Sequence, residues 1–199
     1  MTAPLVTAPM QTGPRAPVRP AADLLHEARA RERAACIPEA AALYEAAIAA
    51  AEPAGEHAAL AEALRRFAVL RHRRGESAEA RELCRRSHAV ACHAGNAVLA
   101  GEAVNTLGGI DLATDAVVDA RQNFLRALEL GGQSRELRAR VEQNLGILAN
   151  IQGDFDEALA RYGRSLEAYR ASNDEHGCAI AYHNLGMASA VSALRRASS

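Results

Sequence analysis

Hydrophobic and small residues recur along this chain with helical spacing, and residues 144–162 show the pattern most clearly. Leu145 lies on the apolar stripe of a predicted helix, and Gly146 follows it directly. A glycine inside a helix costs about 1 kcal/mol relative to alanine, so its presence indicates the close approach of a second helix. Ala158 and Tyr162 are four residues apart and therefore share one face of that second helix. The pattern predicts a hairpin of two helices that pack through small residues.

The boundaries between predicted helices carry termination and capping signals. Gly153 is predicted to end one helix, and Asp154 to begin the next with Glu157 as its capping-box partner. Ser77 is predicted to cap another helix, and the segment 172–175 to form a further capping box. These signals predict short turns between successive helices.

The hairpin recurs every 38 to 40 residues. The first helix of a pair carries a glycine directly after a leucine, at Gly108, Gly146 and Gly186. The second helix carries a small residue, at Ala40, Ala80, Ala120 and Ala158. Four residues after each of these comes Tyr44, Cys84, Phe124 or Tyr162. Two position classes with one period predict a solenoid of helical pairs, because a single pair cannot bury its own apolar faces.

At these residues the chain resembles the tetratricopeptide repeat family. The family pattern places Leu-Gly or Leu-Ala on helix A of each unit, and a small residue followed four positions later by an aromatic residue on helix B. The resemblance covers roughly residues 21–191, with a spacing longer than the common 34-residue unit. It implies an all-α fold, an α-α superhelix that forms a right-handed solenoid of about four and a half helix-turn-helix repeats.

The chain divides into a predicted arm, a repeat domain and a tail. Residues 1–20 contain five prolines and are predicted to be a disordered arm, with a proline-rich docking peptide as the alternative. The repeat domain spans residues 21–193, and residues 194–199 form the tail. Its predicted units are 21–54, 56–94, 96–131, 134–171 and a half unit at 173–193.

The half unit holds a helix A without a helix B. We expect its apolar residues Ile180, Leu185, Met187 and Val191 to be largely uncovered. Exposed apolar patches of this kind mark interfaces. The sequence therefore predicts self-association through residues 173–193 or a fragment of a longer protein, in preference to a helix that serves as a finished cap.

Composition narrows the possible functions. Hydrophobic residues make up 49% of the chain but aromatic residues only 4%, which favours thin layers of closely approaching helices. The net charge of −1 gives no drive toward nucleic acid or an anionic membrane. We see no secretory signal and no apolar run of the length that a spanning helix needs. The four cysteines form no CxxC pair, so we expect a reduced, cytoplasmic protein.

Two clusters of reactive or charged residues have ordinary structural explanations. Cys84, His88 and Cys92 lie on one helical stripe, but they spread over about 12 Å along the axis, too far for one zinc ion. We expect small core residues there and no metal. Residues 65–86 are rich in arginine, and we expect a solvated face partly paired with nearby glutamates, with a docking patch as the alternative.

No nucleophile, base and orienting residue can be assembled from the motifs of this sequence, so we expect no enzymatic activity and no cofactor. The Asp154-Phe155-Asp156 segment lacks the further ligands of a calcium loop. Its carboxylates are better placed to interact with a helix N-terminus.

The family resemblance implies that helix A of each unit lines a concave groove. The positions that face this groove map to Arg65, Val69, Asn105, Thr106, Leu112, Gln143, Asn144, Ile147, Asn150, His183, Asn184 and Met187. Side-chain amides offer both donors and acceptors, so Asn144 and Asn184 could clamp the backbone of an extended peptide. The alternative is that these asparagines serve helix–helix packing. The lysines of the family's carboxylate clamp are absent.

The sequence therefore predicts a noncatalytic module that binds a peptide or protein segment in its groove. The alternative is a sensory or regulatory arm of a larger signalling protein or transcription regulator. Binding of single-stranded RNA is not expected, because neither the 38 to 40 residue spacing nor the charge fits a base-reading repeat.

Overall fold

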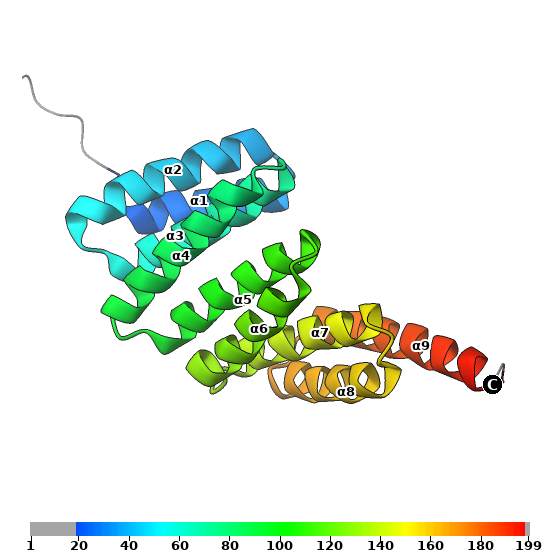
Figure 1. The fold of residues 1–199 in the computed structure, drawn as a ribbon. Coiled ribbons are helices and arrows are strands. Elements are labelled where there is room, and N and C mark those ends of the chain that lie inside the picture. The colour runs from blue at the N-terminus through cyan, green and yellow to red at the C-terminus, as the bar shows by residue number, and fades with distance from the viewer. Residues whose placement is uncertain (1–18, 198–199) are drawn as a thin grey trace, which may run out of the picture.

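Figure 1 shows a computed structural model, which describes residues 19–197. The predicted arm lies outside the described residues except for Arg19 and Pro20. Within residues 19–197 the chain forms nine helices and no strand. They are α1 (Ala21–Arg33), α2 (Ile37–Ala54), α3 (His57–Arg73), α4 (Ser77–His93), α5 (Ala97–Ala113), α6 (Val117–Gly131), α7 (Arg135–Ile151), α8 (Phe155–Ala171) and α9 (Glu175–Ala197).

Consecutive helices pair into hairpins that stack along a curved path (Figure 1). The A helices α1, α3, α5, α7 and α9 each contact the next A helix in the stack. The backbones of the B helices α2, α4, α6 and α8 lie further apart, and long side chains such as Arg86 with Glu52 and Arg121 with Glu157 connect them. The A helices therefore form the inner layer of the curve. This arrangement confirms the predicted all-α superhelical solenoid.

Most turns between helices use one residue in the left-handed backbone region, and these residues recur every 20 positions. They are Ala35, Gly55, Gly75, Gly95 and Asp115, then Gly153 and Asn173. Between α6 and α7 the pattern differs, because α6 continues to Gly131 and the short turn contains no such residue. A Cβ on Gly131 would lie 2.5 Å from Leu137 Cδ2, so this glycine allows α7 to pack tightly. Helix α6 has 15 residues whereas α5 and α7 have 17, and this difference accounts for the spacing of 38 residues between Gly108 and Gly146.

The repeat glycines of units three and four lie where neighbouring helices come closest. A Cβ on Gly108 would be 2.7 Å from the ring of Phe124, and one on Gly146 would be 2.6 Å from the ring of Tyr162. Cβ atoms do not approach other atoms so closely, so the close contact predicted for Gly146 is confirmed. Gly186 occupies the same repeat position on α9, but nothing lies within 4 Å of its Cβ position.

Two of the predicted helix caps are wrong. Asp154 caps α8 as predicted, since its Oδ1 accepts a hydrogen bond from the Glu157 backbone at 2.9 Å. Ser77 instead lies inside α4 and contacts the His72 ring at 2.9 Å. In the 172–175 segment the cap is Asp174, which accepts from Gly177 N at 2.8 Å. The residue directly after a left-handed turn residue takes the cap position, which moves the cap away from both serines.

Helix α9 is covered more than the sequence suggested. Ile180 and Leu185 are half-buried, and Leu185 packs against core residues of α7 and α8. The expectation that both would be largely uncovered is wrong, because α9 lies along α8 and also contacts α7. The large apolar side chains that remain exposed on α9 are Tyr182, Met187, Val191 and Leu194.

Candidate functional site

The predicted groove residues all lie on A helices, the inner layer of the solenoid. Helix α3 carries Arg65 and Val69, and α5 carries Asn105, Thr106 and Leu112. Helix α7 carries Gln143, Asn144, Ile147 and Asn150, and α9 carries His183, Asn184 and Met187. The two halves of this row differ in their chemistry.

The N-terminal half of the row contains charges that neutralise one another. Arg65 of α3 lies 2.9 Å from Glu102 of α5, and Arg140 of α7 lies 2.5 Å from the other oxygen of the same carboxylate. Only 12% of the Arg65 side chain is exposed. Arg29 and Arg66 pair with Glu62 one layer earlier. The guanidinium of Arg65 is therefore occupied by a contact between repeats.

The C-terminal half of the row carries amides. Asn144 Nδ2 donates to Asn105 Oδ1 at 3.0 Å, which links α7 to α5. Gln143 accepts a hydrogen bond from the Tyr169 hydroxyl at 3.1 Å. Asn184 of α9, one repeat further on, is half-buried and makes no side-chain hydrogen bond within residues 19–197. Its exposed neighbour His183 also makes none in that range. Some of these amide groups therefore bond neighbouring helices to one another, and others keep hydrogen-bond donors and acceptors that no described residue uses.

Apolar side chains lie beside these amides. Val69, Leu112 and Ile147 are half-buried, while Met187 is 58% exposed. Ile151 and Val191 occupy one repeat position 40 residues apart and are 61% and 40% exposed. Sequence reasoning did not include Ile151 in the groove, although its distance from Val191 was a usable signal. Asn150, between Ile147 and Ile151, has a buried Oδ1 without a hydrogen-bond partner in the described part of the chain.

The arginine-rich segment 65–86 is largely paired with carboxylates. Arg71 lies 2.8 Å from Glu76 and 3.0 Å from Glu45. Pairs between repeats, within a helix or within a turn also occupy Arg65, Arg66, Arg74, Arg81, Arg85 and Arg86. The contacts favour the solvated, paired face over the docking patch.

The cysteine and histidine residues of α4 lie in different environments. Cys84 is buried in the core, and burial raises the pKa of its thiol to about 12. Cys92 is exposed, with its sulfur 3.6 Å from His88 Nε2. Burial and the nearby Arg126 guanidinium lower the pKa of His88. Among residues 19–197 no three His, Cys, Asp or Glu side chains are grouped to hold a metal ion.

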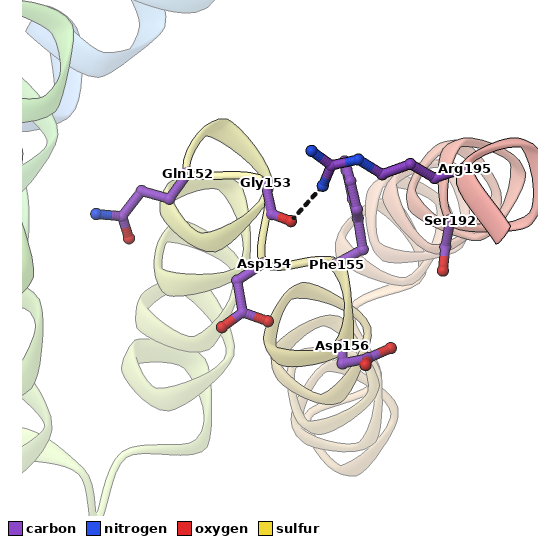
Figure 2. A pocket seen from close by; sticks show the side chains of 7 residues that line it. All are labelled: Gln152, Gly153, Asp154, Phe155, Asp156, Ser192 and Arg195. Atoms are coloured by element: carbon purple, nitrogen blue, oxygen red, sulfur yellow. Dashed lines mark hydrogen bonds between the residues drawn. The ribbon is translucent and has the colours of Figure 1, made fainter. Parts of the chain in front are cut away.

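A surface hollow of about 670 Å³ lies where the end of α9 meets the turn between α7 and α8 (Figure 2). Arg195 reaches across it and donates to the Gly153 carbonyl oxygen at 3.3 Å. Its guanidinium carbon lies 5.5 Å from the centre of the Phe155 ring. The lining residues include no cysteine or histidine. The contacts of Arg195 across this hollow anchor the end of α9 to the preceding hairpin.

No helix in the described part of the chain has both the length and the apolar composition required to cross a bilayer. The statement applies to the helices within residues 19–197.

The fold resembles solved structures at low sequence identity. The apo form of RapI matches with a TM-score of 0.66 and 16% identity, over 85% of this chain and 48% of the RapI chain. The chain thus spans about half the length of RapI. BtubC (BKLC) from P. vanneervenii matches with a TM-score of 0.56 and 19% identity, over 86% of this chain and 89% of that one. At these identities the likeness concerns the fold. No curated protein sequence matches significantly.

The repeats themselves match a family model. The model for the tetratricopeptide repeat matches twice, over residues 99–171 and 136–193. These matches contain the Leu-Gly pairs at Gly108, Gly146 and Gly186 on which the spacing argument rests. Residues 99–193 of this chain are therefore tetratricopeptide repeats.

Proposed function

We propose that this protein is a noncatalytic interaction module that binds a peptide or protein segment in the concave groove of its A helices. Helical repeat solenoids of this type present extended concave surfaces to their partners. The observation that carries the proposal is the row of amides on α5, α7 and α9, which lies beside exposed apolar side chains. The binding region is the C-terminal half of the groove, from Asn105 to Met187.

The amides set the kind of segment that fits. Asn144 uses one N–H to bind Asn105, so its second N–H and its carbonyl oxygen remain, and Asn105 keeps its own NH₂ group. Asn184 keeps its full set of donors and acceptors within residues 19–197. Donors and acceptors in a row match the alternating C=O and N–H groups of an extended backbone. Met187 and Ile151 then offer contact surface for apolar side chains of the bound segment.

Charge argues against an acidic segment or a nucleic acid as the ligand. The groove arginines Arg65 and Arg140 share Glu102, so an acidic ligand would have to compete with an existing ion pair. Binding to a phosphate backbone depends on basic side chains that neutralise phosphates. The net charge of −1 supplies no excess of them. We therefore propose a neutral, partly apolar protein segment, bound in a reducing cytoplasm that suits four free cysteines.

The test is selection of binding peptides from a displayed library, followed by calorimetric measurement of affinity. The double variant Asn144→Ala/Asn184→Ala should weaken binding of the selected peptides about tenfold or more, because each lost hydrogen bond contributes about 0.5–1.5 kcal/mol. The matched control is Gln122→Ala/Gln133→Ala, which removes two exposed amides outside the A helices. Equal affinities for wild type and the groove variant would remove the groove assignment.

A second candidate is a regulatory role, in which this solenoid is the sensory arm of a larger signalling protein. The observation that favours it is the match to RapI, which covers most of this chain but 48% of RapI. The test is the reading frame after the codon for Ser199. Continuation into an output domain would support the regulatory arm, and a stop codon there would contradict it.

A further inference from the structure

One face of helix α9 is exposed, whereas the equivalent face of helix α7 is covered by α8. On α7, the carbonyl oxygen of Ala139 accepts a hydrogen bond from Ser165 of α8 at 2.9 Å. Glu142 forms ion pairs with arginines of α8, and Gly146 lies against the ring of Tyr162 of α8. Forty residues later, the equivalent positions of α9 are exposed. We name this surface the Tyr182 face, and it consists of Ala179, Tyr182, Gly186, Ser189 and Ala193.

The chain repeatedly packs an aromatic ring against a glycine, and the Tyr182 face carries an exposed ring and an uncovered glycine. Aromatic rings lie against glycines at Phe124 on Gly108 and Tyr162 on Gly146, and Tyr169 of α8 lies against Gly177 of α9 in the same way. All seven Phe and Tyr residues lie in the described part of the chain. Tyr182 is the exposed one among them, at 53%.

Gly186 is in turn the Leu-Gly glycine that no ring covers within residues 19–197. The exposed aromatic ring and the Leu-Gly glycine without an aromatic ring are therefore four residues apart on one helix face.

This spacing makes the face self-complementary. If two copies of α9 pair antiparallel about a two-fold axis, Tyr182 of each copy comes opposite Gly186 of the other. Such an interface is isologous, since each contact occurs twice. Antiparallel pairing is also the geometry in which successive helices of each hairpin pack within the chain.

The surroundings of Tyr182 hold the ring in place for this contact. Arg170 of α8 donates a hydrogen bond to the Tyr182 hydroxyl, and its guanidinium carbon lies 5.6 Å from the ring centre. A largely apolar hollow of about 430 Å³ lies beside the ring, lined in part by Cys178 and Ala179. The far end of α9 is fixed by Arg195 at the turn between α7 and α8 (Figure 2). A partner helix therefore meets a helix that is already held at both ends.

We propose that the Tyr182 face is a homodimer interface, in which α9 of two copies pair antiparallel and Tyr182 of each packs on Gly186 of the other. Met187 and Val191, which are also exposed apolar residues of α9, do not belong to the Tyr182 face. The interface is thus separate from the proposed peptide site, although one helix contributes to both.

Sedimentation velocity of the full 199-residue chain tests the proposal, at concentrations from about 1 to about 200 µM, where micromolar association is visible. Wild type should change from monomer to dimer across this range. Gly186→Leu should remain monomeric, and it should fold normally because nothing lies within 4 Å of the Gly186 Cβ position. Tyr182→Ala should also remain monomeric. The control Ile151→Ser, which removes an exposed apolar side chain outside the face, should dimerise like wild type.

Mixing the two defective variants provides a second measurement. In a mixed dimer, the leucine at position 186 of one copy would fill the space left by Tyr182→Ala in the other copy. At the second contact, Tyr182 of the first copy would pack on Gly186 of the second copy, as in wild type. We therefore expect the mixture to recover dimer that neither variant forms alone. Wild type that stays monomeric throughout would overturn the proposal and leave the face to a helix of a different protein. Dimers unaffected by Gly186→Leu, or no recovery on mixing, would also contradict the pairing.

The groove proposal can fail independently of this one. Asn144→Ala/Asn184→Ala should leave the dimer unchanged, since neither asparagine belongs to the Tyr182 face. Loss of dimer in that variant would contradict the interface described here.

Discussion

The ring of Tyr162 on α8 lies directly against the backbone of Gly146 on α7, so closely that a Cβ on Gly146 would be 2.6 Å from ring carbon Cδ1. Phe124 and Gly108 repeat this contact one unit earlier. A glycine that weakens the isolated helix thus permits the close approach of its partner helix. The superhelix and its concave inner layer depend on this approach.

Replacing Gly146 with leucine should destabilise the protein by about 1–3 kcal/mol or more, because a side chain there overpacks the contact with Tyr162. Urea unfolding followed by circular dichroism measures the change. The matched control is Gly186→Ala at the same repeat position, where nothing lies within 4 Å. It should stabilise the monomer by up to about 1 kcal/mol through helix propensity. Unchanged stability in Gly146→Leu would mean that the contact is not close in solution.

The repeat pattern predicted the fold because it is local and redundant. Gly146 and Tyr162 lie within one hairpin, and their spacing recurs at Gly108 and Phe124, so the helical pairs follow from sequence alone. The tight packing of the turn after Gly131 could not be predicted in this way. This packing depends on Leu137, a residue of the following helix.

The groove was harder to predict, because its chemistry depends on contacts between repeats. Arg65 looks like a free groove cation in the sequence, but its partner is Glu102, 37 residues away on the next A helix. The pair formed by Asn144 and Asn105 has the same origin. Periodicity places side chains on a face, and it does not reveal which of them bind one another across it.

Asp111 on α5 is a buried carboxylate that links three helices. It is bound by Arg81 of α4 at 2.8 Å and by Asn123 of α6 at 2.8 Å. Asp111→Ala should cost about 2–4 kcal/mol, since it leaves Arg81 Nε and Asn123 Nδ2 without their acceptor. The control Glu82→Ala breaks an exposed pair with Arg85 and should cost less than about 0.5 kcal/mol. Similar losses in the two variants, measured by urea unfolding, would contradict this assignment.

The stability of the protein should fall in acid partly through Glu157. A hydrogen bond from Arg121 lowers the pKa of Glu157, which is also close to Arg161. A group with a lowered folded-state pKa contributes stability above its unfolded pKa and loses it as the pH falls through the folded value. Glu157→Gln should therefore be less stable than wild type at pH 7, and the difference should shrink below the ordinary carboxyl pKa of about 4.3.

Denaturant midpoints across this pH range check the Glu157 prediction. Glu129→Gln is the control, because Glu129 is exposed and forms no ion pair in the described part of the chain. A constant difference between Glu157→Gln and wild type at all pH values would show that the ion pair is not its source.

The thiols should differ widely in reactivity. Cys84 is buried, with its thiol pKa raised to about 12, and it should resist alkylation in the native state. Cys92 is exposed and should react first. Timed iodoacetamide labelling with peptide mass spectrometry measures both rates in one sample. Labelling of Cys84 as fast as Cys92 would contradict the packing of α4 against the core.

The most direct test of the proposed binding site is methyl NMR of the protein with a peptide selected for binding. Ile147 and Met187 lie in the proposed half of the groove, whereas Ile37 and Ile48 lie on α2, a B helix at the other end of the solenoid. The account predicts that the methyl signals of Ile147, Ile151 and Met187 shift on binding while those of Ile37 and Ile48 stay in place. Shifts confined to α2, or to the B helices in general, would contradict it.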